Sequence, residues 1–458
     1  MQHGWTEREV EAYLEAHVGR APGTKIQYGH PSPRFWQQRD LSMAQALRRC
    51  DGSRPLNLYL HIPFCPPTEP DACGFCLFAR EDYVSQRAVD AYVEDLLLEL
   101  AAVVACLGRR TLETLYFGGG TPNVLSESNI RRIFRALHDG FDIPPGCETS
   151  FEGTPALFTE ARLRTLHEVG VNRISIGAQT LDPLLVQHSG RLQRPEQVER
   201  TLAFCRRNGI RSSVDLITGW FGQGAEHVTR DIEQLHAWGA DAIVNHPLTL
   251  GGDSEFARRK HELPSVQESC ISFLRGRDRL LELGYRPDGY TDYCRSDLPP
   301  VRFLEMYRDV LHHDRVGLGY GANSLLAGSC ANPGLTFRNV LGQQPYRERV
   351  RRGVETGDFA IVDVAFVFEA VDLALLHVLK GLEGTPWLQA ASYSANTGGD
   401  LQADFAPWWQ ALQARGWLEW RDGGPTLVGD GIYYTSEVQR CLSEPRNQAL
   451  RRGRRASP

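Results

Sequence analysis

Three cysteines lie close together in residues 58–78, which read LYLHIPFCPPTEPDACGFCLF. Cys65, Cys73 and Cys76 follow an apolar run that is typical of a buried strand, and their spacing is C-x7-C-x2-C. Clustered thiols occur in disulfide frameworks, zinc sites and iron–sulfur sites. A zinc ion needs a fourth ligand, for which His61 is the near candidate. The spacing alone leaves these three kinds of site open.

Composition favours a metal site over disulfides. The chain has 458 residues, enough for two or three domains, and its hydrophobic content of 42% and charged content of 23% are typical of soluble proteins. It has no apolar run of the roughly 20 residues that a membrane helix needs, and its start is no signal peptide. We therefore predict a cytoplasmic protein without a membrane partner, where disulfides are rare.

The remaining cysteines are scattered along the chain, and most are predicted to be structural: Cys50, Cys106, Cys147, Cys205, Cys270, Cys330 and Cys441. The formal net charge of −6 offers no electrostatic basis for binding nucleic acid. We therefore expect no nucleic-acid partner.

The elements that must position the cysteines form a regular alternation. Apolar, strand-like runs occupy residues 56–64, 114–117, 148–152, 173–177, 212–217 and 242–246. Helix-like runs occupy residues 88–107, 127–137, 161–169, 183–188 and 228–238. This order predicts an α/β fold with a parallel sheet, either barrel-like or doubly wound. In such sheets the chemistry lies at the carboxyl ends of the strands, where the cysteine loop falls.

The flanking regions predict further units. Residues 1–55 form an N-terminal extension to the core of residues 56–250, and residues 251–360 extend and connect that core, with a Gly/Pro-rich, irregular stretch at 249–300. Residues 361–445 read as a small helical or winged-helix-like domain, and residues 446–458 as a basic, disordered tail.

Other strand ends carry residues that fit a ligand site. The glycines of GGGTP at 118–122 follow the second strand and permit close approach of backbone to a ligand. Glu152 follows the third strand, Gln179 and Arg191 follow the fourth, and Asp215 ends the fifth. Each residue alone is a weak signal, but their common position with the cysteines predicts one site on one rim.

The motifs YLHIPFC…CGFC, YFGGGTP, SFEGTP, NRISIGAQT and VDLITG occur in this order. Together they closely resemble the radical S-adenosylmethionine (SAM) enzymes of the oxygen-independent coproporphyrinogen III oxidase type. The resemblance runs from about residue 56 to 250 and continues more weakly through GLGYGANS at 317–324 into the C-terminal region. It implies a partial (β/α)6 TIM-like barrel with an N-terminal extension and a C-terminal winged-helix-like domain.

The resemblance also implies the cofactors. Cys65, Cys73 and Cys76 would hold a [4Fe–4S] cluster, and its fourth iron would bind the amino and carboxylate groups of SAM. An electron from the cluster then cleaves SAM to methionine and a 5′-deoxyadenosyl radical, while the protein orients and shields this chemistry. A small-molecule substrate and an electron donor such as flavodoxin or ferredoxin are implied partners.

The SAM-binding residues follow from the motifs. Tyr59 resembles the tyrosine that contacts the SAM carboxylate, and Glu152 resembles the acidic partner of its amino group; both are the predicted catalytic residues. The remaining predicted contacts are Phe75 near adenine, the turn of Gly119, Gly120 and Thr121 at the amino group, and Gln179, Arg191, Asp215 and Ile217 at SAM or a second SAM. For Phe75 and Ile217, plain core packing is an equal alternative.

The chain departs from the family pattern at several points. The usual cluster spacing is C-x3-C-x2-C, to which PPTEPDA adds four residues. Phe78 stands where the oxidases carry a further cysteine, and GYTDYC at 289–294 replaces G-x-D-H-F-A. FLEMYR at 303–308 keeps only Tyr307 of the H-N-x-x-Y-W segment of the haem chaperones. The resemblance places Cys294 in a substrate-proximal segment.

These departures favour the methyltransferase and cyclopropanase branch of the family. Its members have an N-terminal extension and C-x-F after the last ligand cysteine, and are thought to bind two SAM molecules at once. The predicted function is C-methylation or cyclopropanation of an unsaturated or heteroaromatic substrate in specialised metabolism. The alternative is a coproporphyrinogen III dehydrogenase-like or other porphyrin-processing radical SAM enzyme.

Overall fold

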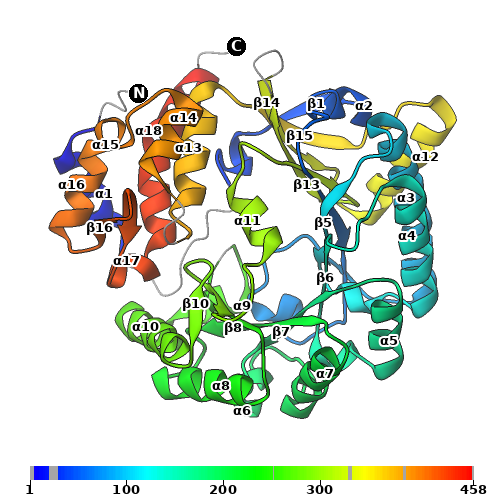
Figure 1. Cartoon of the computed structure of the whole chain (residues 1–458), viewed down its shortest axis with the longest axis horizontal. Coiled ribbons are helices and arrows are strands. Elements are labelled where there is room, and N and C mark those ends of the chain that lie inside the picture. The colour runs from blue at the N-terminus through cyan, green and yellow to red at the C-terminus, as the bar shows by residue number, and fades with distance from the viewer. Residues whose placement is uncertain (1–4, 20–28, 251, 329–332, 385–387, 456–458) are drawn as a thin grey trace.

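One large sheet organises the chain. The computed structural model describes residues 5–19, 29–250, 252–328, 333–384 and 388–455. Thirteen strands form a single sheet in the order β1-β15-β14-β13-β12-β2-β5-β6-β7-β8-β9-β11-β10. The sheet curves into an open barrel with helices around its outside (Figure 1). The predicted α/β barrel is therefore confirmed, and its two edge strands leave it unclosed.

Six parallel strands form the centre of this sheet, and all six predicted strand runs lie in them. They are β2 (Leu56–Ile62), β5 (Leu112–Gly119), β6 (Glu148–Gly153), β7 (Arg173–Gln179), β8 (Arg211–Thr218) and β9 (Ala242–Pro247). Each strand pairs in parallel with the next. Their carboxyl ends therefore meet at one edge, which we call the barrel rim.

Helices cover the outer face of the parallel strands (Figure 1). The predicted helices are α3 (Gln86–Leu107), α4 (Glu127–Gly140), α5 (Glu160–Glu168), α6 (Pro183–Gln187) and α8 (Ala225–Ala237). Side chains of Ser85, Ser126 and Thr159 cap the starts of α3, α4 and α5 by accepting backbone N–H groups. The sequence prediction missed α7 (Pro195–Arg207), which buries Val198 and Leu202 between polar residues.

Both edges of the parallel region carry additional strands. β12 (Asp314–Leu318) pairs in parallel with β2, and an antiparallel series continues from it. This series comprises β13 (Asn323–Gly328), β14 (Pro333–Asn339) and β15 (Val362–Val367), and ends at β1 (Gln37–Leu41) from the N-terminal region. At the other edge, β11 (Asp292–Arg295) and β10 (Tyr285–Pro287) continue antiparallel from β9.

The prediction of an irregular stretch at 249–300 was wrong. This region contains α10 (Val266–Glu282), which begins at a capping box of Ser265 and Glu268. Gly276 lies inside α10, where a Cβ would lie 2.8 Å from a methyl group of Val228 in α8. The glycine therefore permits close helix packing and does not mark a loop.

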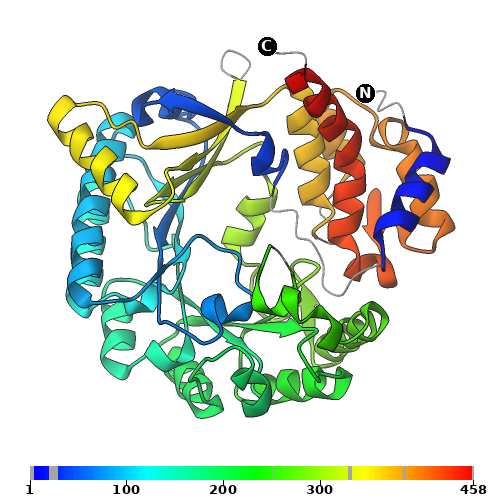
Figure 2. The same cartoon turned by 180° about the vertical axis from the view of Figure 1, so that it is seen from behind.

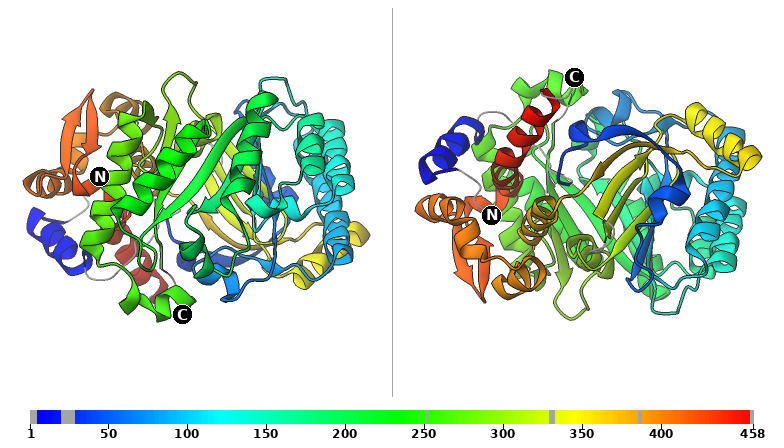
Figure 3. Two further views of the ribbon diagram at one scale, coloured as in Figure 1. Left: turned by 90° about the horizontal axis from the view of Figure 1, so that it is seen from below. Right: turned by 90° about the horizontal axis from the view of Figure 1, so that it is seen from above.

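A helical unit lies beside the open side of the barrel (Figure 3). It contains α13 (Ala370–Gly381), α14 (Ala390–Thr397), α15 (Leu401–Asp404), α16 (Ala406–Ala414), the hairpin of β16 (Leu418–Arg421) and β17 (Gly424–Leu427), α17 (Asp430–Tyr433) and α18 (Thr435–Arg455). A helical domain with a hairpin is therefore present at the C-terminal end, as expected. Among the described residues, no helix combines the length and apolarity needed to span a membrane.

The two ends of the chain differ from the sequence prediction. Val10 and Leu14 of α1 (Glu7–His17) are buried in the same apolar cluster as Trp408 and Trp409, so α1 belongs to the C-terminal unit. β1 instead joins the barrel sheet, so the N-terminal extension divides between two units. The basic tail is helical through Arg455 and not disordered over that length, because α18 continues into it from its buried part.

Candidate functional site

The cysteine loop and the glycine-rich loop lie side by side on the barrel rim. Cys65 ends the short strand β3 (Phe64–Cys65) just after β2, and GGGTP begins in the last two residues of β5, the neighbouring strand. The Gly120 N–H donates to the carbonyl of Ile62 at 2.9 Å, and the Thr121 N–H donates to that of Phe64 at 2.8 Å. The Thr121 hydroxyl donates to Cys65 Sγ at 3.3 Å. Figure 2 shows the blue segment after β2 running across the opening of the barrel.

The glycines are required by this close approach. Gly119 has a φ of +110°, and a Cβ there would lie 2.6 Å from the His61 ring. A Cβ on Gly120 would lie 2.6 Å from the carbonyl oxygen of Pro63. Larger residues would therefore push the glycine-rich loop away from the segment that leads into Cys65.

The three predicted ligand thiols lie close enough that Cys73 and Cys76 both affect the pKa of Cys65. Burial raises the pKa of Cys65 to about 11; the Thr121 hydroxyl opposes this rise, and the nearby Cys76 and Cys73 add to it. Burial also raises the pKa of Cys76. These thiols therefore need a bound cation to hold them as thiolates, which iron supplies. All the described cysteines are free of disulfides, and Cys330 lies outside the described residues.

The donor set fits an iron–sulfur cluster better than a zinc ion. Among the described residues, no group of three or more His, Cys, Asp or Glu side chains is arranged to hold a metal ion in this structure. A cluster of four irons spreads its thiolates further apart than one tetrahedral ion does. His61, the candidate fourth zinc ligand, has its Nδ1 3.0 Å from the Tyr59 hydroxyl and its Nε2 2.9 Å from the Ala79 carbonyl oxygen. Both ring nitrogens are therefore engaged elsewhere.

Glu152 lies partly buried at the end of β6 and beside the glycine-rich loop. Its carboxylate accepts a hydrogen bond from the Tyr116 hydroxyl and another from the backbone of Gly119. Burial nevertheless raises the pKa of Glu152 to about 7, because the charged form loses its hydration. A cationic ligand would restore the charged form. The sequence analysis missed Tyr116, although it points inward on β5 at the same level as the predicted Tyr59 on β2.

An aromatic stack extends from Tyr59 into the barrel interior. The Tyr59 and Tyr116 rings stack with centroids 6.2 Å apart, and Tyr116 stacks on Phe303 at 4.2 Å. Phe303 belongs to α11 (Arg302–Arg308), the helix at the centre of Figure 1. The Glu148 carboxylate accepts the N–H groups of Arg302 and Phe303 at 3.0 and 3.2 Å, which caps this helix inside the barrel. The interior below the rim is therefore closed by side chains.

Gln179 and Arg191 meet at the end of β7. Gln179 has a φ of +69°, and Arg191 donates to the Gly177 carbonyl at 2.7 Å and to the Thr154 hydroxyl at 3.0 Å. The charge of Arg191 also lowers the pKa of Cys76, against the larger effect of burial. The structure therefore brings both predicted residues to the rim, on the side of the cysteine loop.

Asp215 is buried beside a charge that the sequence analysis missed. It accepts a hydrogen bond from the Ser175 hydroxyl at 3.1 Å, and burial raises its pKa. Arg173, buried at the start of β7, opposes that rise and also interacts with Glu148. The Nε of Arg173 has no hydrogen-bond partner among the described residues. The sequence feature that could have indicated Arg173 as a site residue is an arginine at an inward-facing position at the start of a strand.

Phe75 and Ile217 lie together in an apolar cluster. Phe75 packs edge-on against Trp220 and Phe256, with ring centroids 5.5 and 5.7 Å apart. Ile217 packs against the same cluster, which also includes Leu248. Both residues are only partly buried, so they leave apolar surface next to the cysteine loop. Their packing accounts for their residue types without a ligand.

Cys294 does not lie near the rim. It pairs in register with Ala242 at the start of β9, and the Arg211 guanidinium at the start of β8 donates to its sulfur at 2.7 Å. Both contacts lie at the amino ends of parallel strands, opposite the end that carries the cysteine loop. Cys294 therefore lies at the opposite end of the strands from the cysteine loop, since β11 runs antiparallel to β9.

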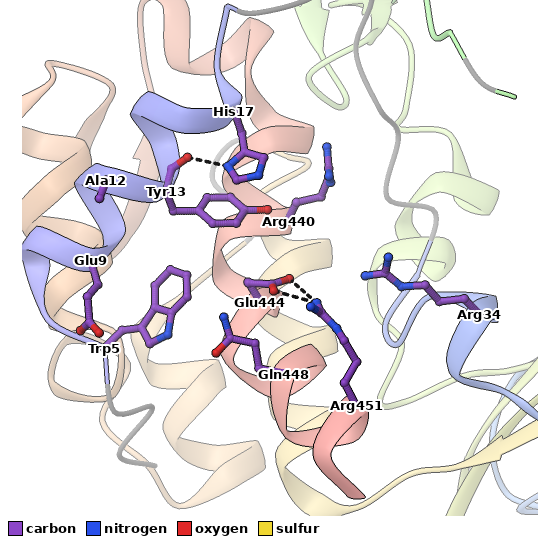
Figure 4. Close-up of a pocket in the computed structure, with 10 residues that line it drawn as sticks. All are labelled: Trp5, Glu9, Ala12, Tyr13, His17, Arg34, Arg440, Glu444, Gln448 and Arg451. Atoms are coloured by element: carbon purple, nitrogen blue, oxygen red, sulfur yellow. Dashed lines mark hydrogen bonds and ion pairs between the residues drawn. The ribbon is translucent and has the colours of Figure 1, made fainter. Parts of the chain in front are cut away.

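A pocket of about 640 Å³ lies elsewhere, between α1 and α18 (Figure 4). It is lined by Trp5, Glu9, Ala12, Tyr13, His17, Arg34, Arg440, Glu444, Gln448 and Arg451. None of the residues predicted for the site is among them. We call this hollow the α1–α18 pocket.

Comparison with known proteins identifies the class of this domain. Residues 59–235 match the family model of the Radical SAM superfamily. These residues therefore form a radical SAM domain, and the cofactors of such a domain are a [4Fe–4S] cluster and SAM. The predicted cofactors are confirmed at this level.

The chain is similar to two kinds of curated protein. It is 27% identical over 270 residues to the haem chaperone HemW of Escherichia coli, covering 59% of this chain and 70% of that protein. It is 31% identical over 245 residues to the oxygen-independent coproporphyrinogen III oxidase of Paracoccus denitrificans, and covers 52% of each protein. The solved coproporphyrinogen III oxidase HemN of Escherichia coli has a similar fold, with a TM-score of 0.76 and 22% identity over 91% of this chain and 96% of that chain.

Proposed function

We propose that this protein is a radical SAM enzyme that removes a hydrogen atom from a tetrapyrrole-type substrate. The observation that carries the proposal is the convergence on one rim of three cysteines, a glycine-rich turn and a partly buried carboxyl group. The haem chaperones and coproporphyrinogen oxidases among its sequence relatives supply the substrate class. They favour this alternative over the methyl transfer that the departures in the sequence predicted.

Each element of the site has a role in this proposal. Cys65, Cys73 and Cys76 hold the cluster, and the Thr121 hydroxyl stabilises one thiolate by donating to Cys65. When bound, the cluster supplies the electron that splits SAM into methionine and a 5′-deoxyadenosyl radical. The rim residues thus bind and orient SAM so that the radical forms next to the substrate.

Glu152 accepts a hydrogen bond from the amino group of SAM. Its shielded position makes this charge-assisted hydrogen bond stronger than it would be in water, and the hydrogen bond from Tyr116 fixes the carboxylate. Tyr59, two strands from Glu152 on β2, is the proposed donor to the SAM carboxylate; its hydroxyl lies 3.0 Å from His61 Nδ1 in this structure. Gln179 at the end of β7 and Arg191 beyond α6 both lie beside Gly177, and in this proposal they contact SAM or the substrate.

The barrel interior shields the reaction from water. The stack of Tyr59, Tyr116 and Phe303 closes the space below the rim, and Glu148 holds the helix that carries Phe303. Exclusion of water protects a reactive radical from side reactions. The apolar surface of Phe75 and Ile217 would accept a flat, unsaturated group such as adenine.

Methyl transfer is the second candidate, and one observation favours it. Phe78 stands at the position where the oxidases carry a further cysteine, and its side chain is 54% exposed beside the cluster ligands. A phenylalanine at this position cannot perform any thiol chemistry. In this second reading a second SAM is the methyl donor and Gln179, Arg191, Asp215 and Ile217 are its contacts.

One isotope experiment separates the two candidates. The reconstituted protein is incubated anaerobically with a reductant, SAM carrying a trideuterated methyl group, and either coproporphyrinogen III or an unsaturated heteroaromatic acceptor. The proposal expects 5′-deoxyadenosine without deuterium, formed only with the porphyrinogen, because its new hydrogen comes from the substrate.

Methyl transfer gives a different pattern. Deuterium would enter 5′-deoxyadenosine from the methyl group of the second SAM, and S-adenosylhomocysteine would accumulate with it. That result would replace the tetrapyrrole proposal with methyl transfer. Absence of SAM cleavage by a protein with its full cluster would refute both candidates.

A further inference from the structure

The first two ligand cysteines are separated by an unusually long segment, PPTEPDA at residues 66–72. A short spacing holds two ligands near each other through the chain itself, but a longer one lets them separate. Ala72 and Cys73 have φ values of +54° and +53°, a left-handed conformation that is unfavourable for residues with a Cβ. Contacts from outside the segment must therefore hold Cys73 in place.

One such contact is the packing of Glu69 on Gly190, in the loop after β7. Gly190 has a φ of +65°, and a Cβ there would overlap the carbonyl oxygen of Glu69 and lie 2.7 Å from its backbone nitrogen. The colliding atoms belong to the backbone, so a side-chain rotation cannot relieve the overlap. Any larger residue at 190 therefore displaces the segment.

A second contact lies on the other side of the loop. A Cβ on Gly74 would lie 2.8 Å from the Phe256 ring and 2.9 Å from Pro70. Phe256 belongs to α9 (Glu255–Arg258) and is fully buried. The loop is therefore held between Gly190 and Phe256, two residues that are distant in sequence.

Local hydrogen bonds complete the segment. The Thr68 hydroxyl donates to the Pro70 carbonyl at 2.9 Å and accepts the Cys73 N–H at 2.9 Å. Arg80 forms ion pairs with Asp71 and Asp82. These bonds make residues 68–73 a compact turn. A displacement of Glu69 therefore also displaces Cys73.

We propose that Gly190 is the positioning residue for Cys73. Its lack of a side chain lets the backbone of Glu69 pack against the loop after β7. This contact holds Cys73 in place, as a short spacing between the two cysteines would. The inference rests on the proposed function to the extent that Cys73 is a cluster ligand. The docking itself is a property of the folded chain.

The test compares Gly190→Ala with Gly209→Ala. Gly209 has a φ of +66°, almost equal to that of Gly190, but a Cβ there meets no atom within 4 Å. The two variants therefore suffer the same backbone strain and differ only in the overlap with Glu69. Iron and sulfide per chain are measured after anaerobic reconstitution, with circular dichroism to verify the fold.

We expect Gly190→Ala to lose most of its iron and sulfide and Gly209→Ala to keep the wild-type content. Hydrogen exchange of the iron-free proteins supplies the second measurement. Peptides covering residues 66–76 should exchange faster in Gly190→Ala than in Gly209→Ala, because the Cys73 and Cys76 amides lose a fixed turn.

Equal iron content and equal exchange in the two variants would overturn the proposal. A wild-type protein that binds no iron would instead refute the proposed function, and the exchange comparison would still decide whether Gly190 holds the loop. Arg191→Ala serves as a further control, because a defect that acts through Arg191 would lower SAM affinity and leave the iron content unchanged.

Discussion

The barrel rim and the α1–α18 pocket are built in opposite ways. On the rim, backbone hydrogen bonds from Gly120 and Thr121 bring two loops together around partly buried thiols and a partly buried carboxyl group. In the pocket, the charged groups lie on helix surfaces, and Arg451 and Glu444 already neutralise each other at 2.7 Å. The α1–α18 pocket therefore carries less reactive groups than the barrel rim does.

The difference has a topological cause. Parallel strands deliver the residues that follow them to one edge, so side chains far apart in sequence meet there by the pairing of strands alone. Two packed helices such as α1 and α18 leave grooves, but nothing in their packing directs reactive groups into them. In this molecule, the order of the parallel strands brings the reactive groups together at the rim.

The largest expected effect is loss of the cluster. Replacing Cys65, Cys73 or Cys76 with Ala removes a thiolate ligand, whereas Cys205→Ala removes a buried thiol on α7. The wild-type protein should hold about four iron and four sulfide per chain after anaerobic reconstitution. We expect the three ligand variants to lose them and Cys205→Ala to retain them. Loss of iron from Cys205→Ala alone would show that the ligands were misassigned.

Glu152→Gln should have the next largest effect. The substitution keeps the shape of the side chain but replaces the charged carboxylate that accepts a hydrogen bond from the SAM amino group. A charge-assisted hydrogen bond contributes about 1.5–3 kcal/mol, so SAM affinity should fall by about ten- to a hundredfold with the cluster intact. Equilibrium binding of SAM to the reconstituted protein measures this. An unchanged dissociation constant would remove Glu152 from the site.

The affinity for SAM should depend on pH through the same carboxyl group. Because burial raises the pKa of Glu152 to about 7, the group is protonated below that pH in the free protein. SAM must then displace a proton, so its dissociation constant should fall as the pH rises towards about 7 and level off above it. Titrations at several pH values test this, and Glu152→Gln should lack the dependence. A wild-type affinity that weakens as pH rises would contradict the assignment.

Arg440→Ala, in the α1–α18 pocket, should have the smallest effect. Arg440 lines the pocket and forms no hydrogen bond or ion pair with another described residue, so its removal should change the free energy of unfolding by less than about 0.5 kcal/mol. Iron content and SAM affinity should equal those of the wild type. A loss of SAM affinity would mean that a change in the pocket alters ligand binding at the rim. The two regions would then not be independent.

Local pattern determined the centre of the fold and the position of the rim. Period-2 and period-3.6 alternation predicted the six parallel strands and most of their helices, because these signals depend on neighbours along the chain. The cysteine spacing and the glycine-rich turn follow directly on two of those strands, so the sequence also placed them on one edge.

Only the tertiary structure decided which distant segments pair. β12 joins β2, α1 joins the C-terminal helices, and Phe303 reaches Tyr116, none of which any local pattern indicates. The position of Cys294 was decided in the same way, since the direction of β11 depends on its pairing with β9. Such contacts arise from long-range burial and hydrogen bonding between surfaces, and their free energy depends on residues that are separated by up to hundreds of positions in the chain.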